Sequence, residues 1–433
     1  MSFLPIIFHR TFLVQKGVRV ALKIVYKVCC GIDVHKTFVV ACIASTNRQG
    51  ITTYKSHRFS TFTSGLKMLL QWLLDNNCQD VCMESSGKYW IPVYNVLEND
   101  CTIVLAHPKY VKAIRGKKTD KKDAKWIADL FKHDLVAGSF MPPADIRQLR
   151  DLMRYRFKLT CFMSSEKNRL QNCLTVSNIQ LASVVSDTFG KSSLKILDKL
   201  LENPLDTSFD IEPLIHGSMK TKLPELQLAI DGYITPEQVG KLKIIKAHFK
   251  DLETRKAELE ELILALATPY QQELDIILTA PSFKNRFSAI TIISEIGTNM
   301  EAFPSAKHLC SWAGLTPTNN ESAGKKKSVR VSKAGCYIKP LLVQCANSVV
   351  KSEKHPEIRS RYLRLRKRRG HKKAIIAIAR MLLTALYRML KDKEPYNADL
   401  YRKSDLIPVE REITVEQAIL MAQFHGYRIK AAV

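Results

Sequence analysis

Runs of apolar residues divide the first third of the chain into short strands and helices. Three β-forming runs come first, close enough together in sequence for an antiparallel meander, and amphipathic helices then alternate with short apolar strands. The expected strands are Val25–Ile32, Phe38–Ala44, Thr52–Phe59, Asp80–Met83 and Thr102–Ala106, and the expected helices are Leu66–Leu74, Tyr89–Leu97 and one that opens at Thr119 and ends at Phe131. We therefore expect a mixed sheet flanked by helices.

This order of elements outlines a ribonuclease-H-like fold for residues 23–145. The next segment, 146–268, is polar and helix-favouring, with long helices expected over Arg147–Thr175 and Gln238–Ala267. Heptad-like apolar positions in the second helix, at Leu252, Leu259, Leu262 and Leu266, favour a helical or coiled-coil arm, with an ordinary helical spacer as the alternative. Residues 269–398 form a mainly helical C-terminal domain, so the expected fold class is α/β plus all-α. No role is assigned to residues 1–22, a leader, or to the extension 399–433.

The charge of the chain indicates a polyanionic partner. Its 433 residues favour two or three domains, and 67 Lys and Arg against 41 Asp and Glu give a formal net charge of +26. Nucleic acid is the first candidate. The basic run that includes Arg364, Arg366, Lys367, Arg368 and Arg369 is dense enough to favour backbone contact over a merely solvated helix face.

The cysteines and the apolar segments favour a cytoplasmic protein without a membrane span. The 11 cysteines have neither zinc-ribbon spacing nor the density of a disulfide scaffold, and Cys42, Cys82 and Cys345 lie in apolar runs as small core residues. The N-terminal run lacks the features of a signal peptide. The apolar helix expected from Ala374 to Leu390 contains arginines, which indicates a packed helix.

Four acids fall where such a sheet would bring them together. Asp33 ends the first strand, Glu84 ends the fourth, and Asp120 and Asp123 share one face of the helix that opens at Thr119. Taken singly, each has a plain structural explanation, as a turn aspartate or a helix-capping acid. Together, they would repel one another unless cations neutralised them, and Mg²⁺ or Mn²⁺ is the class that suits carboxylate oxygens. His35 is interpreted as a structural neighbour of this site.

Lysines surround the second acidic pair, as an approaching phosphate backbone would require. They are Lys117, Lys118, Lys121, Lys122 and Lys125.

Three segments of the first domain resemble those of a known family. The segments Gly31–Lys36 (GIDVHK), Met83–Trp90 (MESSGKYW) and His107–Leu130 are similar to the catalytic domain of the DEDD transposases of bacterial insertion sequences, the insertion sequence 110 family, whose fold resembles the resolvase RuvC. The resemblance implies that Asp33, Glu84, Asp120 and Asp123 bind the catalytic metal ions.

The C-terminal block resembles the second domain of the same family. Trp312–Pro317 (WAGLTP) leads into Asn320–Lys327 (NESAGKKK), and the family's serine nucleophile corresponds to Ser322, with Lys325, Lys326 and Lys327 placed to hold phosphate. The family has a glycine directly after this serine, whereas Ala323 intervenes here, so Ser328 and Ser332 stay as alternatives. The glycine-rich turn that the family carries near Ala280–Lys284 is absent. A serine hydroxyl needs an activating base or metal, which the acids of the same or another protomer would supply.

The resemblance implies a bacterial, nucleoid-associated transposase that cuts and joins double-stranded DNA at its element ends and target through a serine–DNA link. It further implies a structured guide RNA encoded by the element, and a homodimer or tetramer. Two alternatives remain: a RuvC-like, metal-dependent junction nuclease that uses water, and an inactive nucleic-acid-binding relic.

Overall fold

The computed structural model describes residues 22–85, 87–111, 119–204, 208–317, 320–322, 325–328, 330–399 and 415–424. The chain divides into two compact units, of which the first ends at Met141 and the second begins at Pro142. The segments 146–268 and 269–398 therefore belong to the same unit.

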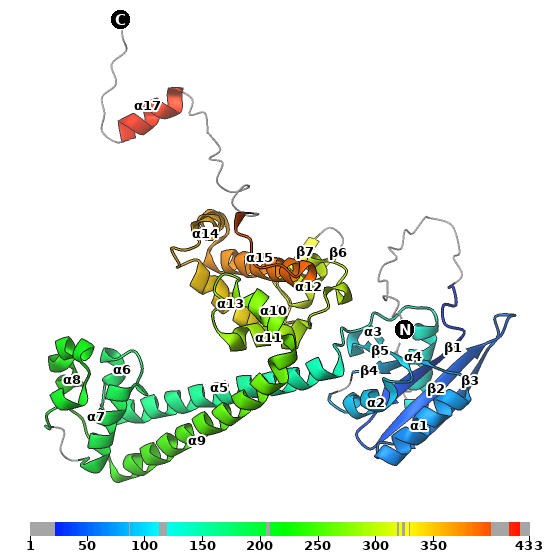
Figure 1. The fold of residues 1–433 in the computed structure, drawn as a ribbon, viewed down its shortest axis with the longest axis horizontal. Helices are drawn as coiled ribbons and strands as arrows, with labels where there is room; N and C mark the ends of the chain where they lie inside the picture. The colour runs from blue at the N-terminus through cyan, green and yellow to red at the C-terminus, as the bar shows by residue number, and fades with distance from the viewer. Residues whose placement is uncertain are drawn as a thin grey trace, which may run out of the picture. The chain divides into compact units, whose positions relative to one another are not determined.

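A five-stranded mixed sheet with the order β3-β2-β1-β4-β5 forms the first unit (Figure 1). The first three strands are antiparallel, and β4 and β5 run parallel to β1, so the predicted meander and parallel strands are confirmed. The strands are β1 (Val28–Val34), β2 (Phe38–Thr46), β3 (Thr52–Ser60), β4 (Asp80–Glu84) and β5 (Thr102–Ala106).

The first strand differs from its predicted bounds. It begins at Val28 because the N–H groups of Val25 and Tyr26 donate to the carbonyl oxygen of Lys132 and so do not pair in the sheet. At its other end it continues through Asp33, which pairs with Val40. Asp33 therefore lies inside the strand and not in the turn that follows it.

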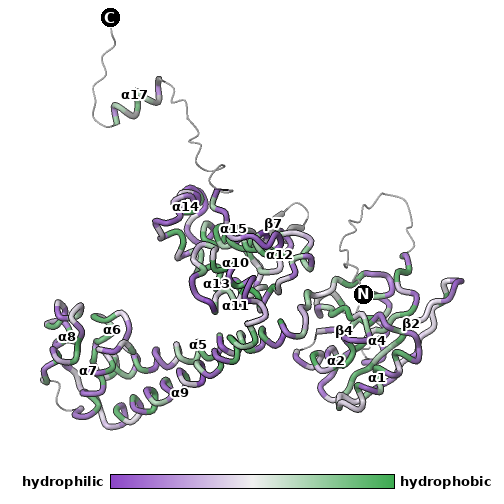
Figure 2. Tube along the Cα trace, viewed as in Figure 1, coloured by the Kyte–Doolittle hydropathy of each residue, from purple (hydrophilic) through white to green (hydrophobic). Residues whose placement is uncertain are grey.

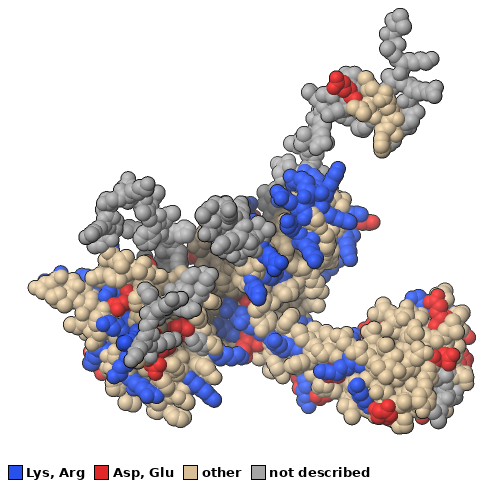
Figure 3. All heavy atoms as spheres, turned by 180° about the vertical axis from the view of Figure 1, so that it is seen from behind, with Lys and Arg blue, Asp and Glu red and all other residues tan. Residues whose placement is uncertain are grey.

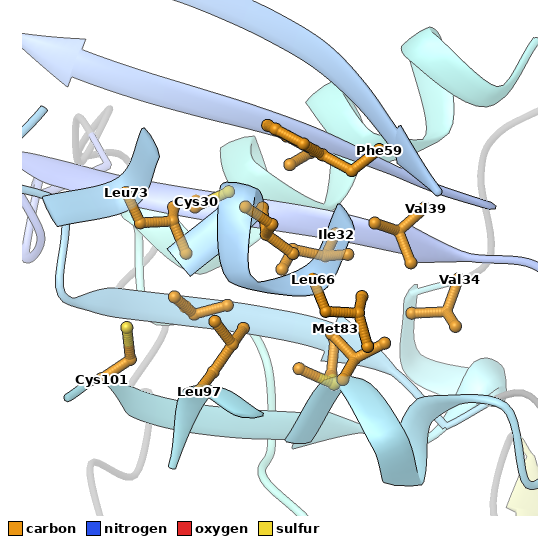
Figure 4. Packing of buried hydrophobic residues seen from close by; sticks show 14 of the residues in the cluster. Cys30, Ile32, Val34, Val39, Phe59, Leu66, Leu73, Met83, Leu97 and Cys101 are labelled. Atoms are coloured by element: carbon orange, nitrogen blue, oxygen red, sulfur yellow. The ribbon is translucent and has the colours of Figure 1, made fainter. Parts of the chain in front are cut away.

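Helices cover both faces of the sheet. The helices α1 (Thr63–Asp75) and α2 (Trp90–Leu97) pack on one face, and α4 (Asp120–Lys132) packs on the other, preceded by the short α3 (Pro108–Val111). Because side chains alternate along a strand, Cys30 and Ile32 enter the core beneath α1 and α2 (Figure 4), whereas Cys29 faces α4.

The backbone of α4 lies directly on β1 at Gly31. A Cβ atom at Gly31 would stand 2.3 Å from the nitrogen of Ala128 and 2.4 Å from the carbonyl oxygen of Ala124. Two residues earlier on the same strand, the thiol of Cys29 donates to the carbonyl oxygen of Ala128 at 3.7 Å. Only glycine permits this approach of helix to strand.

The first part of the second unit contains two long antiparallel helices, α5 (Ala144–Val176) and α9 (Pro236–Ala267) (Figure 1). Arg156 pairs with Glu260, and further along α5 the carboxylate of Glu166 contacts His248, so the contacts step backwards along α9. Their ends share an apolar cluster with short helices: α6 (Leu181–Val184), α7 (Lys191–Glu202), α8 (Leu223–Ala229) and the 3-10 turns Glu212–Leu214 and Gly217–Lys222.

The apolar stripe of α9 differs from the predicted one. Leu252 and Leu259 are buried as expected, but the stripe continues through Ile263 and Ala267. Leu262 and Leu266 are exposed, by 59% and 41%. A straight helix drifts relative to a strict seven-residue repeat, so the position that faces α5 moves on by one residue at this end.

Helices also make up the C-terminal part of the second unit. They are α10 (Gln271–Leu278), α11 (Arg286–Ile296), α12 (Ala306–Trp312), α13 (Ile338–Val349), α14 (Pro356–Arg369) and α15 (His371–Asp392), with 3-10 turns at Thr268–Tyr270 and Met300–Ala302 and the hairpin β6 (Asn320–Ser322) and β7 (Lys325–Ser328). In Figure 2, α15 is largely apolar and α14 is hydrophilic, as expected for the packed helix and the basic helix. A further helix, α17, spans Val415–Phe424. Among the helices that the structure describes, none has both the length and the apolar character for a membrane crossing.

A pair of arginines joins α5 to α11. The half-buried guanidinium of Arg150 donates to the carbonyl oxygens of Ser294 and Glu295, at 2.9 and 2.8 Å. Burial lowers the pKa of Arg150 to about 10. Arg154 forms a bidentate ion pair with the buried carboxylate of Glu295, at 2.8 and 2.9 Å. The C-terminal carbonyls of α11 and its last acid are thus satisfied by one helix.

Replacing Gly31 tests the contact between α4 and β1. We expect Gly31→Ala to lower the free energy of unfolding by about 1–3 kcal/mol, since the helix backbone must move away from the strand. Chemical denaturation measures this. The matched control is Gly240→Ala on α9, which has open space at the Cβ position and is expected to gain up to about 1 kcal/mol. Equal effects of the two substitutions would contradict the packing described here.

Removal of Glu295 tests the link between α5 and α11. We expect Glu295→Ala to destabilise the second unit by on the order of 2–3 kcal/mol, less than for a fully buried pair because Arg154 is 38% exposed. The control is Glu212→Ala, which removes an exposed pair with Lys220. This control should leave the unfolding midpoint unchanged. An unchanged midpoint in Glu295→Ala would show that the link contributes nothing.

Candidate functional site

Asp33 and Glu84 lie side by side at the ends of neighbouring parallel strands. The register pairs Ile32 with Met83, so the next residue of each strand is one of the two acids. Neighbouring strands are about 4.8 Å apart. Cys82, two residues before Glu84, belongs to the cluster beneath α4, and Gly31, two residues before Asp33, touches α4. Both carboxylates are therefore on the α4 face of the sheet.

The first turn of α4 brings the second pair of acids to the same edge. Tyr26, before β1, bonds to Lys132 at the end of α4, whereas Gly31, further along the chain, lies against Ala124 and Ala128. The helix α4 therefore runs opposite to β1 and begins near the end of that strand. The hydroxyl of Thr119 accepts from the N–H of Lys122 at 3.4 Å, so Thr119 is the N-cap of the helix that was predicted to open there. Asp120 and Asp123 both lie in this first turn, where the helix dipole favours negative charge.

His35 lies between two of these acids. Its Nε2 is 3.1 Å from Oδ2 of Asp33 and 3.6 Å from Oδ1 of Asp120. The three atoms all lie within 4.8 Å of one another, a spacing compatible with a shared metal ion. The sequence alone predicts His35 only as a structural neighbour of the site. Its place two residues after Asp33, in the turn that leads to β2, was the available signal.

Electrostatics at Asp33 favour a cation. Burial is the main cause that raises the pKa of Asp33, and the charges of Asp123 and Glu84 raise it further, against the opposing effect of His35. These two acids are therefore close enough to act on Asp33. A hard divalent cation offsets the repulsion among carboxylates and accepts their oxygens as ligands. The donor set fits such an ion.

The structure places the remaining predicted residues as follows. Lys121 and Lys122 are exposed in the first turn of α4, beside the acids. Lys117 and Lys118 lie outside the described residues. Arg364 and the basic residues of the last turn of α14 are exposed, and Figure 3 shows Lys and Arg gathered over this helix.

Ser322 is described only by its backbone. It is the last residue of β6 and pairs with Lys325, the first residue of β7. The side chains of Ser322, Ser328 and Lys325 to Lys327 lie outside the described residues. Ser332 is half-buried, and its hydroxyl accepts from the N–H of Ala334 at 3.3 Å.

Comparison with protein families identifies the chain. A family model described as "Transposase" matches residues 30–179, and one described as "Transposase IS116/IS110/IS902 family" matches residues 275–363. The first range contains all four acids, the second contains Ser322, and together the two cover more than half of the chain. The chain belongs to the IS110 family of transposases. The family predicted from the motifs is thereby confirmed.

A curated relative of this IS110-family chain agrees with that assignment. It is the "Insertion element IS900 uncharacterized 42 kDa protein" of Mycobacterium paratuberculosis, 32% identical over 125 residues. The match spans 28% of this chain and 31% of the relative.

The raised pKa of Asp33 predicts how stability depends on pH without divalent cations. A carboxyl group whose pKa is higher in the folded state destabilises the fold once it ionises, so its unfavourable contribution appears as the pH rises through its unfolded and then its folded pKa. We expect Asp33→Asn to raise the melting temperature at neutral pH in the presence of a chelator. The gain should vanish at a pH below the unfolded pKa of about 3.9.

Thermal unfolding across the pH range measures this effect. The control is Asp75→Asn at the exposed end of α1, which should give no gain at either pH. A loss of stability in Asp33→Asn at neutral pH would show that the carboxylate is favourably held without a cation.

Proposed function

We propose that the protein is the transposase of an insertion sequence and that it cuts and joins DNA strands at a site built from Asp33, Glu84, Asp120 and Asp123. The proposal is supported by the positions of the four acids, at neighbouring strands and in the first turn of the helix that packs on them, within the segment that matches a transposase family. Of the four, Asp33 and Asp120 form a close group with His35, which does not include Glu84 or Asp123. The sheet order and the covering helix support a ribonuclease-H or RuvC-like fold for this unit.

The four acids would hold Mg²⁺ or Mn²⁺. When bound, two such ions activate the attacking oxygen and stabilise the leaving oxygen in phosphodiester chemistry. Asp33 and Glu84 fix the site to the rigid sheet, and Asp120 and Asp123 close it from α4. Lysines 121 and 122, with Lys117 and Lys118 before them in sequence, supply positive charge for the phosphate backbone.

The second unit contributes the nucleophile and further nucleic-acid contacts in this proposal. Ser322, at the end of β6, would attack the phosphorus of the phosphodiester and lose its hydroxyl proton. The bond from phosphorus to one deoxyribose oxygen would break, so that one DNA strand leaves with a free hydroxyl, which takes up a proton, and the other stays linked to the serine as a phosphodiester. Lys325, Lys326 and Lys327 follow it in the hairpin. Arg364, Arg366, Lys367, Arg368 and Arg369 of α14 bind the backbone of DNA or of a structured guide RNA, and their exposure supports this role.

The partners follow from the family in the same way. They are double-stranded DNA at the element ends and the target, a guide RNA encoded by the element, and one or three further copies of the chain. The α5–α9 pair is proposed as a coiled-coil arm that supports assembly, and the exposed Leu262 and Leu266 provide apolar surface for it. The protein acts in the bacterial cytoplasm, at the nucleoid.

Substitution of the acids tests the catalytic site. We expect Asp33→Ala, Glu84→Ala, Asp120→Ala or Asp123→Ala each to reduce strand cleavage by at least about 100-fold, because a ligand of the reacting ions is lost. Binding of DNA or RNA in a mobility-shift assay should change little. The matched control is Asp75→Ala. Full cleavage by the Asp33→Ala, Asp123→Ala double variant would end the proposal of a metal site.

A covalent adduct tests the role of Ser322. Denaturing electrophoresis of a stalled reaction should show protein linked to labelled DNA, and Ser322→Ala should remove the band. If Ser328→Ala or Ser332→Ala removes it instead, the nucleophile is that serine. Cleavage without any adduct would favour a junction nuclease that uses water, and a lack of metal-dependent cleavage would favour an inactive relic.

A further inference from the structure

We propose that His35 is a nitrogen ligand of the ion held by Asp33 and Asp120, and that it gives this position a preference for Mn²⁺ over Mg²⁺. The inference rests on the proposed metal site and adds one ligand and one selectivity to it. The four acids alone leave the choice between the two ions open, since carboxylate oxygens suit both.

The distances among the three side chains match those of ligands around one ion. With bonds of about 2.1 Å, adjacent ligand atoms of an octahedral ion are about 3.0 Å apart and opposite ones about 4.2 Å. Nε2 of His35 is 3.1 Å from Oδ2 of Asp33 and 3.6 Å from Oδ1 of Asp120. Both distances fall within that span, and all three atoms lie within 4.8 Å of one another, so an ion could bind all three after a small movement of the side chains.

The imidazole of His35 is held in this place by its surroundings. It stacks on the ring of Phe38, with ring centroids 4.5 Å apart and an angle of 27° between the ring planes. The backbone N–H of His35 donates to the backbone carbonyl oxygen of Phe38 at 2.9 Å. The guanidinium of Arg58, on β3, lies 3.6 Å from the centroid of the same ring.

The turn that carries His35 is fixed from the end of β3 as well. The hydroxyl of Thr61 donates to the carbonyl oxygen of Lys36 at 2.9 Å, and its N–H donates to that of Thr37 at 3.2 Å. A side chain positioned before the ion arrives loses little conformational freedom on binding it, which is the condition for a tight ligand.

The chemistry of the donor set decides the selectivity. Mg²⁺ strongly prefers oxygen and gives up its water reluctantly, whereas imidazole nitrogen suits transition metals. A nitrogen donor therefore adds more to the binding of Mn²⁺ than to that of Mg²⁺. His35 is also 37% exposed, so an ion can reach it from solvent.

Spectroscopy of bound Mn²⁺ tests this without reference to activity. Mn²⁺ is titrated into the full chain, and its affinity is read from the electron paramagnetic resonance of the free ion. Electron spin echo modulation of bound Mn²⁺ then detects coupled nitrogen, in protein with natural histidine and in protein labelled with ¹⁵N-histidine. We expect a histidine nitrogen signal that changes with the label.

Variants assign the signal and the selectivity. We expect His35→Ala to remove the histidine signal and to weaken Mn²⁺ binding by about 10–100-fold, with a smaller loss for Mg²⁺ measured by competition. The matched control is His57→Ala, since the ring of His57 also packs against that of a phenylalanine, Phe59, at a tilt of 53°, but lies outside the cluster with the acids. Circular dichroism checks that each variant folds. The comparison of labelled with unlabelled wild-type protein does not depend on any variant.

The outcomes separate the inference from the proposed function. If Asp33→Asn abolishes Mn²⁺ binding but bound Mn²⁺ shows no histidine nitrogen, His35 only hydrogen-bonds to Asp33, and the inference is wrong while the metal site stands. Equal losses of Mn²⁺ and Mg²⁺ affinity in His35→Ala would overturn the selectivity. If Asp33→Asn leaves Mn²⁺ binding unchanged, the proposed metal site itself fails.

Discussion

The close approach of α4 to β1 at Gly31 is the contact on which the acidic site depends. Helix backbone meets strand backbone there at a distance that leaves no room for a Cβ atom. Because α4 runs opposite to β1, this contact brings the first turn of the helix to the end of the strand that carries Asp33. Asp120 and Asp123 are thus positioned by a glycine that lies on another element, two residues before Asp33.

The sheet divides two tasks between its faces. Beneath α1 and α2 the strands contribute a continuous apolar core. On the α4 face the same strands carry Asp33 and Glu84 near their ends, and the mutual repulsion and partial burial of these acids work against folding. The apolar face supplies the stability that a cluster of carboxylates removes. Such a balance is typical of sites where function and stability compete.

Much of the site was predictable because strand ends and helix starts leave clear signals. Asp33 and Glu84 follow short apolar runs, and Thr119 before acids marks a helix start. The parallel neighbours β1 and β4 then follow from the expected topology. The family's second domain was equally visible, through the WAGLTP segment, although Ser322 keeps only a sequence-based assignment.

Other features depend on tertiary contacts that no local pattern reveals. The backbone N–H of Tyr26 donates to a carbonyl oxygen of α4 and not to a neighbouring strand, so β1 begins later than predicted. His35 joins the acids only because the β1–β2 turn is held against Phe38 and Thr61. Leu262 fits a heptad in sequence yet is exposed, because the buried position at this point of the helix is Ile263. In each case the deciding residue is distant in sequence or one position away on a helix.

The most direct measurement is an anomalous difference map from crystals of the full chain grown with Mn²⁺. We expect at least one strong peak among the carboxylates of Asp33, Glu84, Asp120 and Asp123. Ordered carboxylates without a peak, or a peak bound by other residues, would contradict the existence of a metal centre at the edge of this sheet.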